Sequence, residues 1–387
     1  MRFAAAAVLL TMFTVACQGT AGEVASSVRT TPSPSQVTMS TKLYCDAHIG
    51  ATALAIYQFA TTSPFVEMLD VSNPLKPSIV CRMDPAYGAH LISNTKLAFW
   101  IGNELGTADL ASGAITRTAR LPAVAGKGAF SADGTKFAYR SYDAAGGMSL
   151  HLYVAGSDRT LYVQEPMGGH GGPGPSFGPF DQLEFSPDGS LLLDAGVFRP
   201  QSAPATFIVF RSDGSIAFQS KTALNGTWSR AGNILFFFSQ SQPGPIGELD
   251  GMIVGGQREV LATGISGFFW PRMSPDGRSI VYNASDSSVP DCGGVPHLWR
   301  FDIATGRTTQ LSKAISSDPF FVQPNVVWSD EQQLSQCGLG GPSSLDGVIL
   351  AHDLSTGVDT KVDTTLLPAS TGPWSTFNLL DTWFAPA

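Results

Sequence analysis

The chain has 387 residues and a formal net charge of -8, with 23 Lys and Arg against 31 Asp and Glu. Charges are spread without long runs of one sign, and a nucleic-acid footprint needs clustered Lys and Arg, so DNA and RNA are excluded as partners. Charged residues are only 14% of the chain, while 41 Gly, 26 Pro and 43% hydrophobic residues favour short strands and turns around an ample core.

Residues 1–16 have the pattern of a signal peptide. Arg2 precedes an apolar run that ends at Ala16 and is too short to span a bilayer as a mature helix. The following "TVAC" resembles the lipobox of bacterial lipoproteins, which implies that Cys17 is lipidated and becomes the mature N-terminus. Ordinary cleavage nearby, which would release a secreted protein, is the alternative.

Residues 17–42 are rich in Ser, Thr, Pro and Ala and offer almost nothing to bury, so they are predicted to form a flexible, lipid-anchored tether. From residue 43 to residue 387 the chain consists of short apolar runs separated by Gly, Pro, Asn and Asp, without a capped stretch at helical spacing. Residues 43–387 are therefore predicted to form one all-β domain.

One phrase recurs in this domain, as "FSADGTKFAYR" from Phe130, "FSPDGSLLLDA" from Phe185 and "MSPDGRSIVYN" from Met273. Successive serines of the phrase lie 38 to 55 residues apart, near the blade length of WD-repeat propellers. Seven units result. Degenerate copies of the phrase contain Ser93, Ser229 and Ser329, and a less marked first unit covers residues 43–59.

The phrase predicts a tight hairpin between two strands, A and B, of each unit. Pro sets φ for the second turn position, Asp accepts hydrogen bonds from nearby backbone N–H groups, and Gly takes the position with φ > 0. These residues are thus assigned a structural role. They are Asp133 with Gly134, Asp188 with Gly189, and Asp276 with Gly277.

A second phrase, seen in "ADLASGAITRT", "FDIATGRTTQL" and "HDLSTGVDTKV", predicts another hairpin, between strands C and D. Two turns per unit imply four strands, and a ring of such units leaves only short, protected sheet edges. The predicted fold is an all-β propeller of four-stranded blades, seven-bladed, with six or eight blades as alternatives. The C-terminal "WSTFNLLDTWFAPA" is predicted to close the ring by completing a blade with N-terminal strands.

The strict repeats, "FSPDGSLLLDA" and "MSPDGRSIVYN…HLWRFDIATGRTTQL", resemble those of the TolB-type, WD-repeat-like propeller. The resemblance covers residues 43–387 and implies that the Asp and Gly of the phrase are turn residues. TolB proteins carry an α/β domain ahead of the propeller, where this chain has the tether, so the resemblance does not extend to a role in the Tol system.

The chain has five cysteines, of which four remain when Cys17 is set aside. These four can form two disulfides in three different connectivities, or they can remain as buried free thiols. Cys292 and Cys337 each follow strand B of successive units and are predicted to pair. Cys45 and Cys81 then pair by elimination, although the repeat pattern places them on strands A and D of one blade, which are not neighbours.

No His or Cys spacing typical of a metal site and no calcium-binding loop occurs, so neither a metal nor a cofactor is predicted. Polar residues on predicted inner strands remain as candidates for a site at the mouth of the central channel. They are Asp46, His48, His90, Glu184 and Arg272. The aromatic run Leu235–Gln240 is predicted to pack between blades, with a sugar- or peptide-binding platform as the alternative.

The sequence therefore predicts a monomeric, exported propeller of the bacterial cell envelope without a catalytic site of its own. Its membrane contact would be the N-terminal lipid, and one face of the disc would bind a protein or an extracellular polymer. The alternative is a propeller enzyme, glycan-active or lactonase-like, with a metal or carboxylate site at the channel mouth.

Overall fold

The structure is a computed structural model, and it describes the following residues of the chain: 41–45, 53–59, 64–143, 147–164, 182–195, 207–240, 246–266, 269–285, 296–312, 315–332, 348–365 and 378–384. These residues form strands and turns only. Within this part of the chain there is consequently no helix of the length and apolarity that a membrane span requires.

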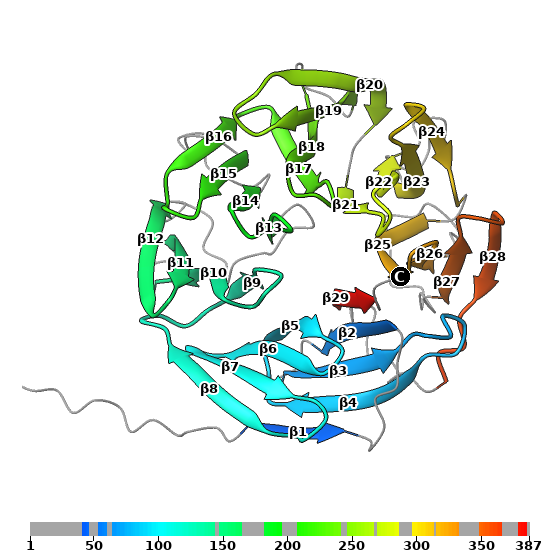
Figure 1. Ribbon diagram of the computed structural model, residues 1–387. Helices are drawn as coiled ribbons and strands as arrows, with labels where there is room; N and C mark the ends of the chain where they lie inside the picture. Colours follow the sequence, from blue (N-terminus) through cyan, green and yellow to red (C-terminus); the bar gives the residue numbers. More distant parts are fainter. Residues whose placement is uncertain are drawn as a thin grey trace, which may run out of the picture. The chain divides into compact units, whose positions relative to one another are not determined.

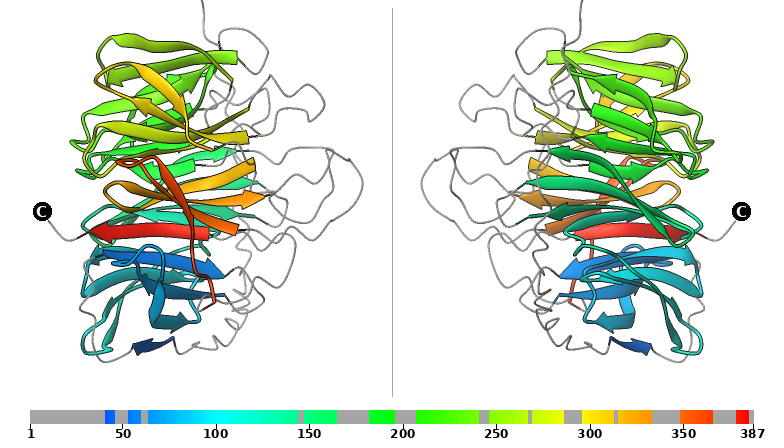
Figure 2. Two further views of the ribbon diagram at one scale, coloured as in Figure 1. Left: turned by 90° about the vertical axis from the view of Figure 1, so that its right-hand side faces the viewer. Right: turned by 90° about the vertical axis from the view of Figure 1, so that its left-hand side faces the viewer.

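Seven antiparallel sheets stand around a common axis and make a seven-bladed β-propeller, as predicted (Figure 1). In the side views the blades form one disc-shaped layer (Figure 2). Strand A of each blade lies next to the axis and strand D lies at the rim. Blade 1 comprises β29 (Asn378–Phe384), β2 (Ala53–Phe59), β3 (Phe65–Asp70), β4 (Ser78–Asp84) and β1 (Lys42–Cys45).

Blades 2 to 7 each contain four consecutive strands, in the order A to D that the two phrases predict. Blade 2 has β5 (Gly88–Ser93), β6 (Lys96–Ile101), β7 (Glu104–Asp109) and β8 (Ile115–Arg120); blade 3 has β9 (Lys127–Phe130), β10 (Lys136–Tyr142), β11 (Met148–Val154) and β12 (Ser157–Gln164); blade 4 has β13 (Gln182–Phe185), β14 (Leu191–Ala195), β15 (Phe207–Arg211) and β16 (Ile216–Ser220). Blade 5 has β17 (Ala223–Trp228), β18 (Ile234–Ser239), β19 (Ile246–Ile253) and β20 (Arg258–Ser266); blade 6 has β21 (Phe269–Met273), β22 (Ser279–Ser285), β23 (Pro296–Asp302) and β24 (Arg307–Gln310); blade 7 has β25 (Ile315–Gln323), β26 (Val326–Gln332), β27 (Val348–Asp353) and β28 (Val358–Lys361).

The ring is closed by the C-terminal strand, as predicted. β29 pairs antiparallel with β2, so that Phe384 lies opposite Ala53, and the two strands lie side by side in Figure 2. Strand A of blade 1 therefore comes from the end of the chain, while its strands B to D come from the beginning.

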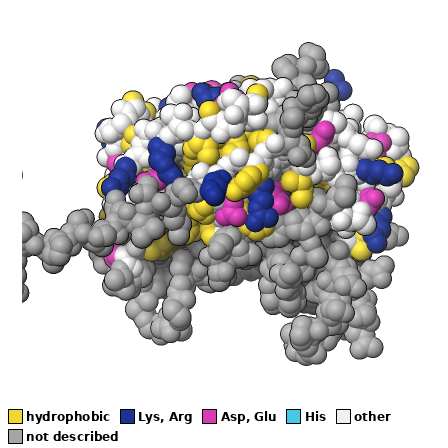
Figure 3. Space-filling model, turned by 90° about the horizontal axis from the view of Figure 1, so that it is seen from below, with side chains coloured by type: hydrophobic (Ala, Val, Ile, Leu, Met, Phe, Trp, Pro, Cys, Tyr) yellow, Lys and Arg dark blue, Asp and Glu magenta, His cyan; other side chains and the backbone are white. Residues whose placement is uncertain are grey.

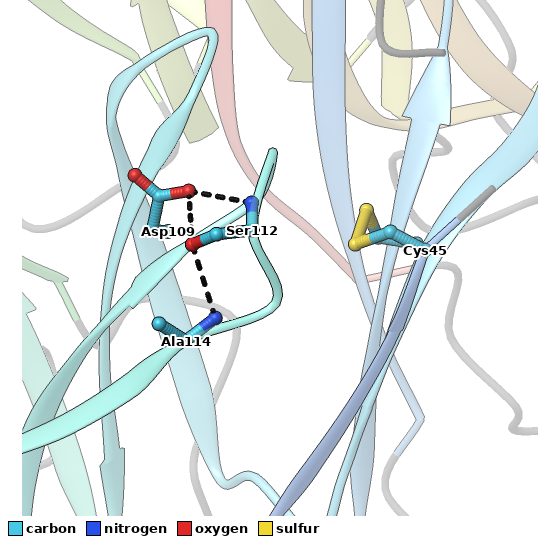
Figure 4. Close-up of a disulfide and its surroundings, with 5 residues drawn as sticks. Cys45, Asp109, Ser112 and Ala114 are labelled. Atoms are coloured by element: carbon cyan, nitrogen blue, oxygen red, sulfur yellow. Dashed lines mark hydrogen bonds between the residues drawn. A yellow bond between two sulfur atoms is a disulfide. The ribbon is translucent and has the colours of Figure 1, made fainter. Parts of the chain in front are cut away.

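This closure corrects the predicted place of the first strand. β1 is not strand A of blade 1 but a fifth strand outside β4, because β29 already occupies the position next to the axis. Cys45 on β1 lies directly opposite Cys81 on β4, and the two form a disulfide (Figure 4). The predicted Cys45–Cys81 pair is thus present, on strands that are neighbours. Cys292 and Cys337 lie outside the described residues, so their pairing stays a prediction.

The phrase forms the predicted A–B hairpin, and its serine has a role of its own. Ser131 Oγ donates to Asp133 Oδ1 (2.6 Å) and accepts a hydrogen bond from the Lys136 backbone N–H (3.0 Å), where strand B begins. Gly134 takes φ = 68°, a conformation that strains side-chain-bearing residues. The same bonds recur at Ser186 and Ser274 with their partners Asp188 and Asp276.

The degenerate copies of the phrase differ in whether they form the A–B hairpin. Ser229 accepts the Ile234 N–H (3.0 Å) in an equivalent hairpin with Gly232 at φ = 75°. Ser329 instead lies within β26, and blade 7 turns from strand A to strand B at residues 324–325. The prediction of a turn at Ser329 was wrong because no glycine follows it to take the position with positive φ.

The second phrase forms the C–D hairpins, of which blade 2 is an example. Asp109 Oδ1 accepts hydrogen bonds from the Ser112 N–H and hydroxyl (both 2.7 Å), and Ser112 Oγ accepts the Ala114 N–H (3.4 Å) (Figure 4). The carboxylate therefore satisfies the donors of its own turn, which explains why Asp recurs there.

Side chains of one blade also hold the A–B turn of the next. His90 Nε2 donates to the Ala132 carbonyl (3.1 Å), and Lys136 Nζ donates to the Gly189 carbonyl (2.6 Å). Arg230 makes the corresponding bond to the Pro275 carbonyl. The turns are thus contacts between blades as well as connections within them.

The hydrophobic core is divided among the seven interfaces between neighbouring blades. Alternate residues of a strand face opposite neighbours: Phe237 packs towards blade 4, whereas Phe236 and Phe238 pack towards blade 6. All three rings are at most 4% exposed, so the described part of the run Leu235–Gln240 belongs to the core, as predicted.

The outer strands are the exposed edges of the blades. Figure 3 shows the rim beside β1 and β8, where Lys and Arg side chains lie near Asp and Glu and between hydrophobic groups. Arg117 pairs with Glu104, and Arg82 pairs with Asp84 (3.2 Å). Charges on edge strands disfavour pairing with another sheet.

Acid should weaken the A–B turns. The hydrogen bond from Ser131 lowers the pKa of Asp133, with burial opposing it and the bonds from Thr135 adding to it. The native state therefore favours the ionised carboxyl, and this stability, present above the unfolded-state pKa, is lost as the pH falls through the folded-state pKa. We expect the free energy of unfolding, measured with urea at pH values from about 5 to about 3, to fall less steeply in Asp133→Asn than in the wild type. Parallel slopes would contradict this role.

Reduction of the Cys45–Cys81 bond should destabilise the propeller by about 2–4 kcal/mol, because the bond closes a loop in the unfolded chain. The measurement is urea unfolding with and without reductant. Because Cys292 and Cys337 are predicted to pair as well, the measurement is made on Cys292→Ala/Cys337→Ala, and the control adds Cys45→Ala/Cys81→Ala, whose unfolding should not respond to reductant. Unfolding of Cys292→Ala/Cys337→Ala that does not respond to reductant would contradict the assignment.

Candidate functional site

The strands next to the axis carry the described residues that the sequence singled out. We call these strands, β29, β5, β9, β13, β17, β21 and β25, the inner wall (Figure 1). Glu184 lies on β13 and Arg272 on β21, as predicted, and His90 lies on β5. Asp46 and His48 lie outside the described residues, so their candidacy is untested.

His90 does not join the other two. Its ring lies against blade 3, with its centroid 6.4 Å from that of Phe130, and its Nε2 donates to the turn carbonyl of Ala132. This histidine therefore contributes to the contact between blades 2 and 3.

Glu184 and Arg272 belong to blades 4 and 6, and the ring places them near enough to interact electrostatically. Desolvation by burial raises the pKa of Glu184, and the positive charge of Arg272 and a hydrogen bond from Gln182 Nε2 (2.7 Å) only partly offset it. A half-buried carboxyl whose pKa is raised is frequent in binding and catalytic sites.

Gln182 fixes this part of the wall by bridging two blades. Its Nε2 also donates to the Gly226 carbonyl (2.6 Å), and its Oε1 accepts the Gly226 N–H (3.1 Å). A side chain at Gly226 would not fit, because a Cβ there would lie 2.8 Å from the Phe236 carbonyl oxygen. Sequence reasoning missed Gln182, since nothing local shows that it contacts residue 226.

Arg272 lies at a distortion of its strand. Between Phe269 and Arg272 strand β21 has two residues opposite one residue of β22, which makes a β-bulge. Trp270 in this bulge has φ = 47°, a conformation that is rare for a bulky side chain and marks local strain. The guanidinium of Arg272 lies 5.3 Å from the ring centroid of Phe320 on β25.

Bulges of the same kind occur on three successive inner strands. The register shifts between Ala223 and Gly226 on β17, between Phe269 and Arg272 on β21, and between Ser317 and Phe320 on β25. Bulges bend a strand and redirect its side chains, and they are frequent beside functional sites. Pro271 and Pro319, which cannot donate to a ladder, were the available sequence signal on β21 and β25.

Two further arrangements have the residue types of a hydrolase triad. In blade 3, Ser141 Oγ lies 3.0 Å from His151 Nε2, and His151 Nδ1 lies 2.9 Å from Asp158. Blade 7 repeats the pattern, as Ser329 and Asp359 each lie 2.8 Å from a ring nitrogen of His352. The sequence signal, His followed seven residues later by Asp across a C–D hairpin, was overlooked.

These Ser–His–Asp arrays have the order nucleophile, base and acid but not the access that catalysis needs. Ser329 and His352 are 1% and 2% exposed, and Ser141 and His151 are 9% and 8% exposed. A substrate carbonyl could not approach either hydroxyl. We interpret the arrays as polar links between strands B, C and D of one blade.

One buried ion pair also joins blades. Arg140 on β10 and Asp194 on β14 are 2% and 0% exposed and pair directly, and Arg140 also donates to the Gln182 carbonyl (3.3 Å). The pair thus supports the strand that carries Glu184. No sequence signal predicts it, because the partners are 54 positions apart and meet only when two blades pack.

These features define the class of the protein: a seven-bladed β-propeller whose inner wall carries a glutamate and an arginine that interact electrostatically. No protein-family model matches the chain, and no curated protein matches it in sequence. Solved structures do resemble it in fold.

A tricorn protease crystal structure matches with a TM-score of 0.53 and 9% identity, over 84% of this chain and 35% of that one. An oligogalacturonate lyase in complex with manganese matches with a TM-score of 0.52 and 13% identity, over 82% and 97%. TolB from Acinetobacter baumannii matches with a TM-score of 0.43 and 14% identity, over 81% and 80%. At these identities the similarity of the first two shows the propeller fold alone, and this chain spans only about a third of the tricorn protease.

Removing one partner of the buried pair should be costly. We expect Asp194→Leu to lower the free energy of unfolding by about 3–5 kcal/mol, because it leaves the Arg140 charge buried without a counter-charge. Arg140→Met/Asp194→Leu should recover most of the loss. The matched control is Glu104→Gln in the half-exposed Arg117 pair, expected to cost at most about 1 kcal/mol. A double variant as unstable as Asp194→Leu, in denaturant unfolding, would refute this explanation.

Proposed function

We propose that the protein is an exported propeller without its own catalytic site, anchored in the bacterial cell envelope by a lipid on Cys17, and that one face of the disc binds a protein or an extracellular polymer. It acts as a monomer with no cofactor, and its membrane contact is the lipid.

The Cys45–Cys81 disulfide supports an extracytoplasmic location, because disulfides persist in oxidising compartments and are rare in the cytosol. The signal peptide of residues 1–16 and the lipidation of Cys17 lie outside the described residues and are proposed from the sequence.

The observation that best supports a binding role is that the Ser, His and Asp side chains suited to catalysis are employed in holding strands together. In both Ser–His–Asp arrays the histidine nitrogens face groups of the same blade, and the serines are buried. The groups best suited to hydrolysis therefore hold strands together. A rigid disc with reactive groups inside and loops at its faces is suited to holding a partner.

The second candidate is an enzyme with a site on the inner wall, and the raised pKa of Glu184 and the positive φ of Trp270, two residues before Arg272, favour it. Within the described ranges no three His, Cys, Asp or Glu side chains are grouped as a metal site would require. A metal-dependent activity would thus need ligands from the rest of the chain.

The test uses the full chain with its natural N-terminus. A photo-crosslinking amino acid is placed at Ile253, beside a C–D turn, at Tyr87, where strand A of blade 2 begins, or at Val163 on an outer strand; all three positions are exposed. Ile253 and Tyr87 probe the two faces of the disc, and one of them should give a crosslinked product in cells. Val163 probes the rim and should give none. Cys17→Ser should move the protein from the membrane fraction to the soluble extracytoplasmic fraction.

Crosslinking from the rim alone would contradict binding on a face, and membrane retention of Cys17→Ser would contradict the anchor. A captured polymer that is chemically changed by the wild type but not by Glu184→Gln would establish the enzyme instead.

A further inference from the structure

Arg272 has hydrogen-bonding capacity that the described residues leave unused. Its Nε is inaccessible to solvent and has no hydrogen-bond partner among them, and its guanidinium faces the Phe320 ring. Buried guanidinium donors are nearly always hydrogen-bonded in proteins, so an orphaned Nε requires an explanation. The rest of the Arg272 side chain is partly exposed, and its terminal nitrogens make no hydrogen bond to a described residue, so a hydrogen-bond acceptor could bind there.

Glu184 does not fill this role. The two groups interact electrostatically, but no direct ion pair forms between them in the described structure. Burial raises the pKa of Glu184 more than the positive charge of Arg272 lowers it. Arg272 therefore offsets only part of the cost of burying the ionised carboxyl. Among the described residues, no carboxylate forms an ion pair with Arg272.

The wall around Arg272 is held in place before any ligand arrives. The bulge of β21 and the positive φ of Trp270 set the direction of the strand, and Gln182 ties the strand of Glu184 to blade 5. Strain and fixed neighbours are expected where a side chain is pre-positioned for binding.

We propose that the inner wall binds a carboxylate group of the partner, which accepts hydrogen bonds from Arg272 next to the Phe320 ring. The proposal rests on the proposed function, in that the carboxylate is held and not transformed. A guanidinium has two parallel N–H groups that match the two oxygens of a carboxylate.

Charge balance favours a carboxylate over a phosphate. One guanidinium balances one negative charge, whereas a phosphate dianion would place a second charge near the carboxyl of Glu184. A metal cation is disfavoured because Arg272 would repel it. The site therefore fits a monoanion with a planar, two-oxygen group.

The experiment uses the full chain with Cys17→Ser, so that it stays in solution, and follows the Arg272 Nε–Hε signal by NMR, assigned with Arg272→Lys. The probes are tri-alanine and its C-terminal amide, glucuronate and glucose, and inorganic phosphate. A peptide acid and a sugar acid distinguish the two sources of a carboxylate. We expect at least one acid to shift the signal, and its neutral analogue and phosphate not to.

Because Arg272→Met and Arg272→Lys lack the reporter signal, the affinity for the acid that binds is measured by isothermal titration calorimetry. It should fall about tenfold or more in Arg272→Met, as expected for loss of a charge-assisted pair, and less in Arg272→Lys. The matched control is Arg307→Met on the exposed strand β24 of the same blade, which should bind as the wild type does. Thermal unfolding confirms that each variant is folded.

If neither acid shifts the signal at millimolar concentration, or if Arg272→Met binds the acid unchanged, the proposal is overturned. If phosphate binds better than both acids, it is overturned as well. Partner crosslinking that survives in Arg272→Met would reject the carboxylate site while leaving the binding function intact, so the two failures are distinguishable.

Discussion

A four-stranded sheet with apolar side chains on both faces is stable only when both faces are covered, and this constraint underlies the whole structure. Each of the seven core clusters lies between two neighbouring blades, so in the part of the chain that the structure describes no blade has a core of its own. In β14, Leu192 contributes to the interface with blade 3 and Leu193 to the interface with blade 5. A ring is the arrangement that gives every blade two neighbours, and the side chains that hold the next A–B turn reinforce the same interfaces.

The fold could be predicted because its determinants are local. A Ser, an Asp and a Gly within four residues specify a hairpin wherever they occur, and their spacing along the chain specifies the blades. Errors arose where the determinant was distant. Cys45 was assigned to the wrong strand because the place of β1 depends on β29, at the other end of the chain. Ser329 was read as a turn although the glycine that makes the turn was missing.

The candidate site could be predicted only in part. The strand positions of Glu184 and Arg272 could be predicted because both are polar residues on strands that the repeat places next to the axis, whereas their role in a site stays a prediction. Their electrostatic contact, the bridge from Gln182 to Gly226 and the Arg140–Asp194 pair connect different blades, and no pattern along one strand encodes the face that a neighbour presents. The Ser–His–Asp arrays show the converse: residue types that suggest chemistry can be fully employed in structure.

The position of β1 determines how the disc responds to a mechanical load. A pull on the chain from the N-terminal side meets β1 first, at the rim, where a covalent bond from Cys45 to Cys81 ties it to β4. The ring itself is closed elsewhere, by the hydrogen bonds between β29 and β2 next to the axis. The disulfide and the outer edge of blade 1 therefore take up the force first. The hydrogen bonds between β29 and β2, which close the ring, are loaded only after them.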